Sequence, residues 1–90
     1  MRNEWKWYVY ILRCQDKSYY VGCTWNTAGR VSQHVSELGG RYTREHGVDK
    51  LMYSEEFDDL EVARNREKQI KGWTREKKEK LISGEWSKEW

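Results

Sequence analysis

The 90-residue sequence contains no proline and only two cysteines, Cys14 and Cys23. The absence of proline excludes a proline-rich linker. Two cysteines cannot build the disulfide network of a small secreted domain, so we expect free thiols and a cytoplasmic, reducing setting. The two histidines, His34 and His46, do not combine with the cysteines at the spacing of a structural zinc site. The sequence also lacks a long apolar run and a signal peptide, and we expect no membrane partner.

A large excess of charge of one sign is missing as well. The formal net charge is +2, which is too small to indicate a nucleic-acid partner by itself. The charges are unevenly distributed, however, because all charged residues between Glu55 and Glu61 are acidic, whereas basic residues dominate from Arg64 to Lys80. The basic segment suits a phosphate backbone, but it also suits a solvated helical face with Glu–Lys pairs.

Aromatic residues are abundant, with six Trp and six Tyr. These side chains supply the large apolar surfaces that a modest core requires. We therefore expect one folded domain spanning residues 1–90, in which residues 84–90 form a loosely docked tail.

Three segments rich in aromatic and β-branched residues are predicted to be strands: 5–13, 19–24 and 50–57. The connection between the first two is short and polar, which predicts an antiparallel hairpin. In the third strand we expect Leu51 and Tyr53 to share one face, because side chains alternate along a strand.

The register of the hairpin decides whether two tyrosines meet. If Cys14 pairs with Ser18, Tyr10 falls opposite Gly22 and shares its face with Tyr20. A slip of one residue would place the two tyrosines on opposite faces. The hairpin is therefore predicted to bring Tyr10 and Tyr20 together.

Three helices are predicted. The first begins at a cap formed by Asn26 or Thr27 and ends at about Leu38, the second covers about 60–71, and the third follows Thr74 and ends at Ile82. The order strand, strand, helix, strand, helix, helix indicates an α+β fold.

Glu67 is an anomaly in the second helix, because it shares a stripe with apolar residues such as Ala63 and Ile70. A carboxylate that faces a core must be neutralised, paired or metal-bound, since burying it alone costs several kcal/mol. One alternative is an ion pair with Arg30 or Lys71. The other is a single Mg²⁺ or Mn²⁺ ion, which prefers oxygen ligands.

The side chains that bear chemistry suit phosphodiester cleavage. This reaction needs an acceptor for a proton of water, a hard cation, and a donor that stabilises developing negative charge. Tyr10 and Tyr20, Glu67 and Arg30 can fill these roles in that order. Each also has an ordinary structural alternative, because the tyrosines can pack on the sheet and Arg30 can be a surface residue. His34 can likewise be a capping or packing residue.

The same residues resemble the motifs of the GIY-YIG endonuclease superfamily, most closely its small single-domain bacterial members related to the excision-repair nuclease domain. The similarity runs from about residue 7 to residue 82. The corresponding positions are Tyr8-Val9-Tyr10, Tyr20-Val21-Gly22, Arg30, His34 and Glu67 within residues 66–73.

The resemblance implies a three-stranded antiparallel sheet flanked by helices, and hydrolysis of DNA by one Mg²⁺ or Mn²⁺ ion bound to Glu67. It implies that Tyr10 receives the proton of water and that Tyr20 assists it, although these two roles can be exchanged. Arg30 would hold the scissile phosphate, while His34 would donate to the leaving oxygen or orient a tyrosine.

Further residues are expected to contact nucleic acid. Gly22 either forms a local bulge or lets a phosphate approach the backbone closely. The expected backbone contacts are Arg41, Tyr42, Arg44, Lys71, Arg75 and Lys78. Such contacts do not depend on sequence, so we expect specificity for flaps, branches or single strands, with DNA as the partner and RNA as an alternative. A homo-oligomer or a larger repair or recombination complex remains open.

Two positions depart from the family pattern. The superfamily often carries an asparagine after the glutamate, whereas the last asparagine here is Asn65, which precedes Glu67. Cys23 stands where some relatives carry a lysine. The alternative function is therefore a catalytically weak or inactive nucleic-acid-binding module with the same fold. A third, a protein-interaction domain, rests only on the tryptophans near the chain ends.

Overall fold

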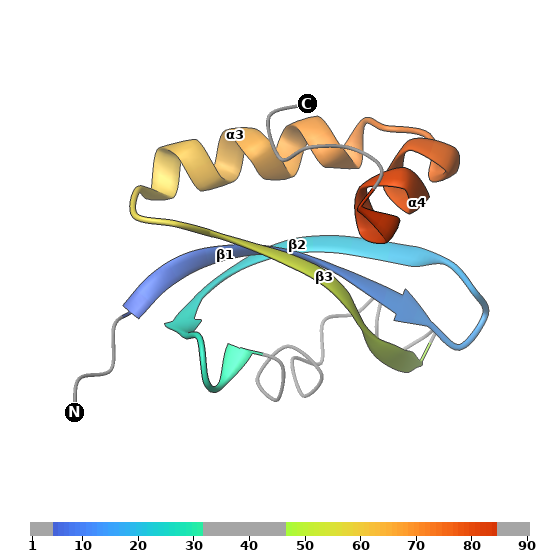
Figure 1. Ribbon diagram of the computed structural model, residues 1–90, viewed down its shortest axis with the longest axis horizontal. Helices are drawn as coiled ribbons and strands as arrows, with labels where there is room; N and C mark the ends of the chain where they lie inside the picture. Colours follow the sequence, from blue (N-terminus) through green and yellow to red (C-terminus); the bar gives the residue numbers. More distant parts are fainter. Residues whose placement is uncertain (1–4, 32–46, 85–90) are drawn as a thin grey trace.

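A computed structural model describes residues 5–31 and 47–84 of the chain. They form strands β1 (Trp5–Cys14), β2 (Tyr19–Thr27) and β3 (Val48–Phe57), followed by helices α3 (Leu60–Lys71) and α4 (Arg75–Ser83) (Figure 1). The sheet is antiparallel with the order β2-β1-β3. The predicted α+β fold is confirmed. The predicted first helix lies outside the described residues from position 32 onward.

The hairpin between β1 and β2 has the predicted register. The backbone N–H of Cys14 donates to the carbonyl of Ser18 at 2.8 Å, and Tyr10 lies opposite Gly22. Tyr10 and Tyr20 consequently share one face, with their ring centroids 6.4 Å apart. Both cysteines are free thiols, as expected.

The strand β2 extends beyond its predicted end, so the prediction that Asn26 or Thr27 caps a helix is wrong. Both residues pair with β1, and the side-chain oxygen of Asn26 accepts the N–H of Thr27 at 2.8 Å within the strand. Arg30 lies in the turn that follows, and its N–H donates to the carbonyl of Thr27 at 3.1 Å. The first helical residue is Val31.

The strand β3 contains a bulge that corrects a second prediction. Leu51 lies opposite Leu12 and Tyr53 opposite Ile11, so Met52 is an extra residue between them. Because an extra residue shifts the alternation of side chains, Leu51 and Tyr53 point to opposite faces. They belong to different hydrophobic clusters.

The central strand β1 supplies both clusters. Val9 and Ile11 pack against residues of α3 and α4 on one face, and Figure 1 shows both helices on that side of the sheet. Tyr8, Tyr10 and Leu12 form the second cluster on the other face. The two faces of the sheet therefore carry separate cores that meet only across the backbone.

Both helices begin at a capping side chain and end at a glycine, and α4 ends one residue after the predicted Ile82. Asp59 accepts the N–H of Glu61 at the start of α3, and Thr74 accepts the N–H of Lys77 at the start of α4. Gly72 ends α3, while Gly84 ends α4 with φ of 87°, a conformation that favours glycine. No helix within the described ranges is both long and apolar enough to cross a bilayer.

Candidate functional site

An open groove of about 340 Å³ runs along one flank of α3 and over the edge strand β2. The helical residues that line it recur at intervals of four, three and four, which places them on one side of the helix. The lining residues are Leu60, Arg64, Glu67 and Lys71 from α3, Cys23 from β2 and Trp7 from β1. Ala63 and Ile70 are turned toward the core instead.

Glu67 lies at the border of this groove, where its side chain is 18% exposed. One carboxylate oxygen forms an ion pair with the ammonium group of Lys71 at 3.1 Å. This pair is one of the two alternatives that the sequence left open. Because about half of the Lys71 side chain is exposed, the pair is screened by solvent and another cation can replace it at small cost.

Tyr10 approaches the same strand from the opposite face. A Cβ atom at Gly22 would lie 2.5 Å from the Tyr10 hydroxyl oxygen and 2.6 Å from Cζ, so the phenol occupies the space that any other residue would fill. The register is regular at Gly22, so the bulge that the sequence suggested is not present there. The missing side chain makes room for Tyr10 over the backbone of β2, and the close approach of a phosphate stays a prediction.

The hydroxyl of Tyr10 lies within electrostatic reach of Glu67. Burial raises the pKa of Tyr10 above its ordinary value, and the negative charges that Tyr20 and Glu67 can carry raise it further. The same carboxylate raises the pKa of the Cys23 thiol, after the larger effect of burial. The charge of Glu67 therefore influences the pKa of Tyr10, although the two residues start from opposite faces of the sheet.

The other predicted catalytic residues do not line the groove or lie outside the described residues. Tyr20 lies half-buried on the face that carries Tyr10. Arg30 is exposed in the turn after β2, and not on the flank of a helix. His34 lies outside the described residues, as do the expected nucleic-acid contacts Arg41, Tyr42 and Arg44.

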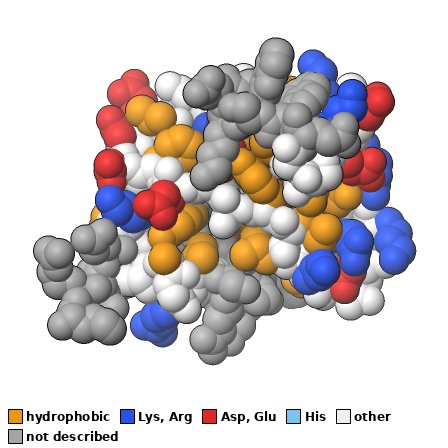
Figure 2. Space-filling view, viewed as in Figure 1, with side chains coloured by type: hydrophobic (Ala, Val, Ile, Leu, Met, Phe, Trp, Pro, Cys, Tyr) orange, Lys and Arg blue, Asp and Glu red, His pale blue; other side chains and the backbone are white. Residues whose placement is uncertain are grey.

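The basic residues of α4 are partly engaged in local contacts. The guanidinium group of Arg75 lies 4.4 Å from the ring centroid of Tyr19, and its Nε is 3.2 Å from a carboxylate oxygen of Glu79. Burial, and then the charge of Arg75, lower the pKa of Lys78. Figure 2 shows Lys and Arg side chains gathered toward the end of this face where α4 lies, mixed with some acids.

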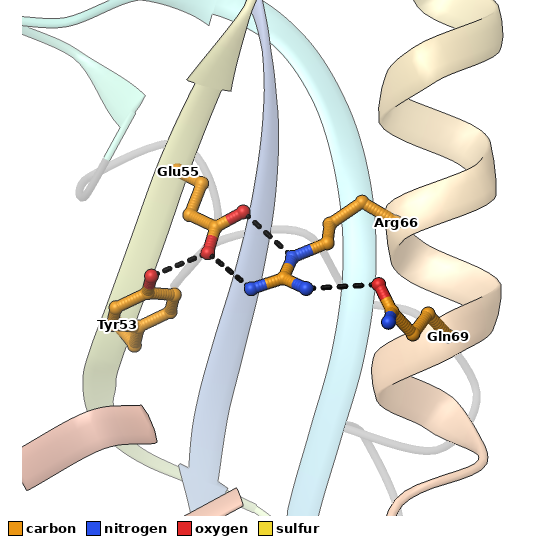
Figure 3. Close-up of polar contacts among 4 residues, drawn as sticks. All are labelled: Tyr53, Glu55, Arg66 and Gln69. Atoms are coloured by element: carbon orange, nitrogen blue, oxygen red, sulfur yellow. Dashed lines mark hydrogen bonds and ion pairs between the residues drawn. The ribbon is translucent and has the colours of Figure 1, made fainter. Parts of the chain in front are cut away.

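A buried polar network between α3 and β3 was not predicted. Arg66 donates from Nε and Nη2 to the two carboxylate oxygens of Glu55, each at 3.0 Å. Its Nη1 donates to the Gln69 side chain at 2.8 Å, and the hydroxyl of Tyr53 donates to Glu55 at 2.5 Å (Figure 3). Arg66 stands three residues after Ala63 and four before Ile70, and this spacing was the available signal that it faces the sheet.

The network fixes the helix that carries Glu67. Arg66 and Glu55 are both buried, and each satisfies the charge of the other. Consecutive residues of a helix are rotated by about 100°. Anchoring Arg66 against β3 therefore turns Glu67 toward β2 and into the groove.

Glu67 is the groove residue that could hold a hard cation. Within residues 5–31 and 47–84, no cluster of three or more His, Cys, Asp or Glu side chains could hold a metal ion. Glu67 offers one carboxylate, and water and phosphate oxygens would supply the other ligands of Mg²⁺ or Mn²⁺. The thiol of Cys23 is a poor ligand here, because its raised pKa keeps it protonated and soft sulfur does not match a hard ion.

Comparison with known proteins gives a consistent result. The model of the GIY-YIG catalytic domain matches residues 6–80. A UPF0213 protein of Clostridium perfringens is 45% identical over 82 residues, covering 91% of this chain and 88% of the relative. A UPF0213 protein of Natronomonas pharaonis is 41% identical over 78 residues, covering 87% and 92% respectively. The solution NMR structure of a UPF0213 protein from Bacillus halodurans shares 40% identity with a TM-score of 0.57, covering 87% of this chain and 83% of that one.

Proposed function

Because this chain belongs to the GIY-YIG catalytic domain family, we propose that it is a divalent-metal-dependent endonuclease that hydrolyses DNA phosphodiester bonds. The observation that supports this most directly is the position of Tyr10 and Glu67 on the two sides of β2. The Tyr10 phenol packs over Gly22, and the Glu67 carboxylate lines the groove between α3 and β2. A phenol and a carboxylate thus lie on either side of one edge strand.

Glu67 is the residue that would hold one Mg²⁺ or Mn²⁺ ion. Such an ion, when bound, stabilises negative charge on phosphate oxygens and lowers the pKa of nearby acids. An ion at Glu67 would compete with the ammonium group of Lys71 for the carboxylate. If Lys71 were displaced, its ammonium group would be available to contact phosphate.

The two tyrosines differ in their environment. Tyr10 is 4% exposed, and its raised pKa keeps the hydroxyl protonated at neutral pH in the free protein. In that state Tyr10 can relay or donate a proton, but it becomes an acceptor only when positive charge enters the groove. Tyr20 is more accessible to solvent and is the second phenol available for proton transfer. We propose that the pair serves water activation, with Arg30 on the scissile phosphate and His34 near the leaving oxygen.

The substrate is proposed to be selected by its shape. Lys71, Arg75 and Lys78, together with Arg41, Tyr42 and Arg44, are candidates for contacts with the phosphate backbone, and such contacts carry no sequence information. DNA with flaps, branches or single strands is the proposed substrate class, with RNA as the alternative. The two free thiols fit a reducing, cytoplasmic location, in which the chain would act alone, as a homo-oligomer or within a repair or recombination complex.

A second candidate function is a nucleic-acid-binding module without efficient cleavage. The Glu67–Lys71 ion pair favours it, because an internal cation already neutralises the carboxylate. Cys23 adds to this argument, since a neutral thiol lines the groove where some relatives carry a lysine. This module would keep salt-sensitive binding but would produce no products.

One experiment separates the two functions. The purified protein is mixed with Mg²⁺ or Mn²⁺ and with duplex, flapped, branched and single-stranded DNA and RNA. For a nuclease we expect products that require metal and that fall by about 100- to 1,000-fold in Glu67→Gln. Glu61→Gln, an exposed acid on the same helix, is the matched control and should cleave normally. Salt-sensitive binding without products in the wild-type protein would establish the binding module instead.

A further inference from the structure

Three tryptophans form a continuous aromatic surface that begins at the groove and ends in solvent. Trp7 lines the groove and lies opposite Trp25 in the sheet, with ring centroids 5.0 Å apart. The ring of Trp5 follows at 5.9 Å from Trp25. Trp25 is 44% exposed and Trp5 is 46% exposed. We call Trp5, Trp7 and Trp25 the tryptophan platform.

Sheet stability explains only part of this arrangement. Cross-strand aromatic pairs stabilise antiparallel strands, which accounts for the contact between Trp7 and Trp25. It does not account for the large indole areas that Trp5 and Trp25 leave in contact with water. Exposed apolar surface next to a polar groove is typical of a binding site.

The charges beside the platform favour an anionic ligand. The groove that Trp7 borders is lined by two basic residues, Arg64 and Lys71, against one acid, Glu67, which pairs with Lys71, so Arg64 leaves it with a net positive charge. A nucleotide combines the two required features, since its phosphate is anionic and its base has a flat face that stacks on aromatic rings.

Two acidic residues immediately before α3 limit the path that a bound nucleic-acid strand can take. Asp58 and Asp59 follow β3, which lies on the opposite side of β1 from β2. Their charges repel phosphate groups. A nucleic-acid strand is therefore expected to run along β2, past Trp25 and Cys23, and not across β1 toward β3.

The spacing along β2 suits a single strand. Cys23 and Trp25 are two residues apart, a distance of about 7 Å in an extended strand. Successive phosphates of one stacked strand rise by about 3.4 Å. A base stacked on Trp25 would therefore be separated from a phosphate at Cys23 and Glu67 by about two nucleotide steps.

We propose that the tryptophan platform stacks unpaired bases of the strand whose phosphate enters the groove. The substrate class is then DNA that contains an unpaired segment within a few nucleotides of the cleaved bond. Bases within a duplex are already stacked on one another and cannot use the platform without unpairing. The role of the groove rests on the proposed nuclease function, whereas stacking on the platform can be measured without cleavage.

The test measures binding to a fluorescent oligo(dT) and to a duplex of equal length, without divalent metal. We expect Trp25→Ala to weaken oligo(dT) binding by about 5- to 150-fold and to change duplex binding little. Trp25→Phe should retain part of the affinity, because phenylalanine also stacks. Val62→Ala is the control: Val62 is 49% exposed on the opposite flank of α3 and should bind as the wild type does. Circular dichroism verifies that each variant is folded.

Several results would overturn the proposal. Equal oligo(dT) affinity for Trp25→Ala and Val62→Ala would do so, as would a parallel loss for single strand and duplex. A variant that lacks residues 85–90 should bind oligo(dT) as the full chain does. If only that shortened variant binds, the chain's own tail occupies the platform.

Cleavage assays separate this proposal from the proposed function. If the wild-type protein cuts no nucleic acid but Trp25→Ala still loses oligo(dT), the platform is supported and the nuclease is not. If Trp25→Ala cuts a flapped duplex with unchanged KM and kcat, the nuclease is supported and the platform is rejected.

Discussion

Arg66 on α3 donates one hydrogen bond to each carboxylate oxygen of Glu55 on β3, and each bond is 3.0 Å long. The pair is buried and is extended by Tyr53 and Gln69. Two-point contact between a planar guanidinium and a carboxylate fixes direction as well as distance. The orientation of α3 therefore depends on a contact with β3. The same contact sets the direction in which the Glu67 side chain points, although Glu67 faces β2.

Breaking this pair should strongly destabilise the protein. Arg66→Met or Glu55→Gln leaves one buried polar partner without its counterpart, and we expect the free energy of unfolding to fall by about 3–5 kcal/mol. Urea denaturation measures this change. Asp58→Asn is the control, because Asp58 pairs with Lys6 at the surface and its loss should cost less than about 1 kcal/mol. Equal losses in the two places would contradict the structural role of the buried pair.

Any side chain at position 22 should displace Tyr10. Gly22→Ala places a methyl group 2.5 Å from the Tyr10 hydroxyl oxygen, so the phenol must move, and we expect a loss of about 1–3 kcal/mol. Double-mutant cycles with Tyr10→Ala test the cause. The cost of Gly22→Ala should shrink in the Tyr10→Ala background, whereas an unchanged cost would mean that the glycine serves the backbone alone.

The protein should lose stability in alkali. Burial is the main reason that the pKa values of Tyr10 and Tyr53 lie above their ordinary value of 10.0, so the folded state holds both protons more tightly than the unfolded chain. This contribution is fully present below about pH 10 and decreases as the pH rises further, by about 1.4 kcal/mol per pH unit and tyrosine. Denaturant titrations between pH 9 and pH 11 should show a shallower decline in Tyr10→Phe. An identical slope in wild type and variant would refute the shift at Tyr10.

Removing Lys71 should make Glu67 a better metal ligand. Lys71→Gln eliminates the cation that occupies the carboxylate, and we expect Mn²⁺ to bind up to about 5-fold more tightly, as measured by electron paramagnetic resonance. Arg75→Gln breaks the comparable pair with Glu79 on α4 and should leave Mn²⁺ affinity unchanged. If both variants bind Mn²⁺ as the wild type does, Lys71 does not compete for the site.

Local signals in the sequence predicted most of the fold. Thr74 marked the start of the last helix, since its side chain satisfies one of the terminal N–H groups. The register of the hairpin followed from one short polar connection. The start of the first helix was wrong, because Asn26 is as suitable for capping as for its contact with Thr27, and only pairing with β1 decides between them.

The candidate site was predicted from chemistry more than from geometry. Glu67 stood out as an acid between apolar residues, but its neighbours on the same flank, Arg64 and Lys71, place it at a polar border and not in the core. The contact of Tyr10 with Gly22 was beyond prediction, because it depends on the path of one ring across a strand. The role of Arg66 was not predicted, because its partner Glu55 lies on a different element. The bulge at Met52 also changes the alternation of side chains in β3, so the face on which Glu55 lies could not be assigned from the sequence.

The bulge gives the chain one position at which it can tolerate a shorter length. Deleting Met52 would join Leu51 directly to Tyr53, and both would keep their present partners on β1, Leu12 and Ile11. Neighbouring residues of a regular strand already point to opposite sides, so each would stay in its own cluster. Deleting Tyr53 instead would place Met52 opposite Ile11 and would remove the hydroxyl that donates to Glu55. A chain that is one residue shorter at Met52 can thus preserve both cores.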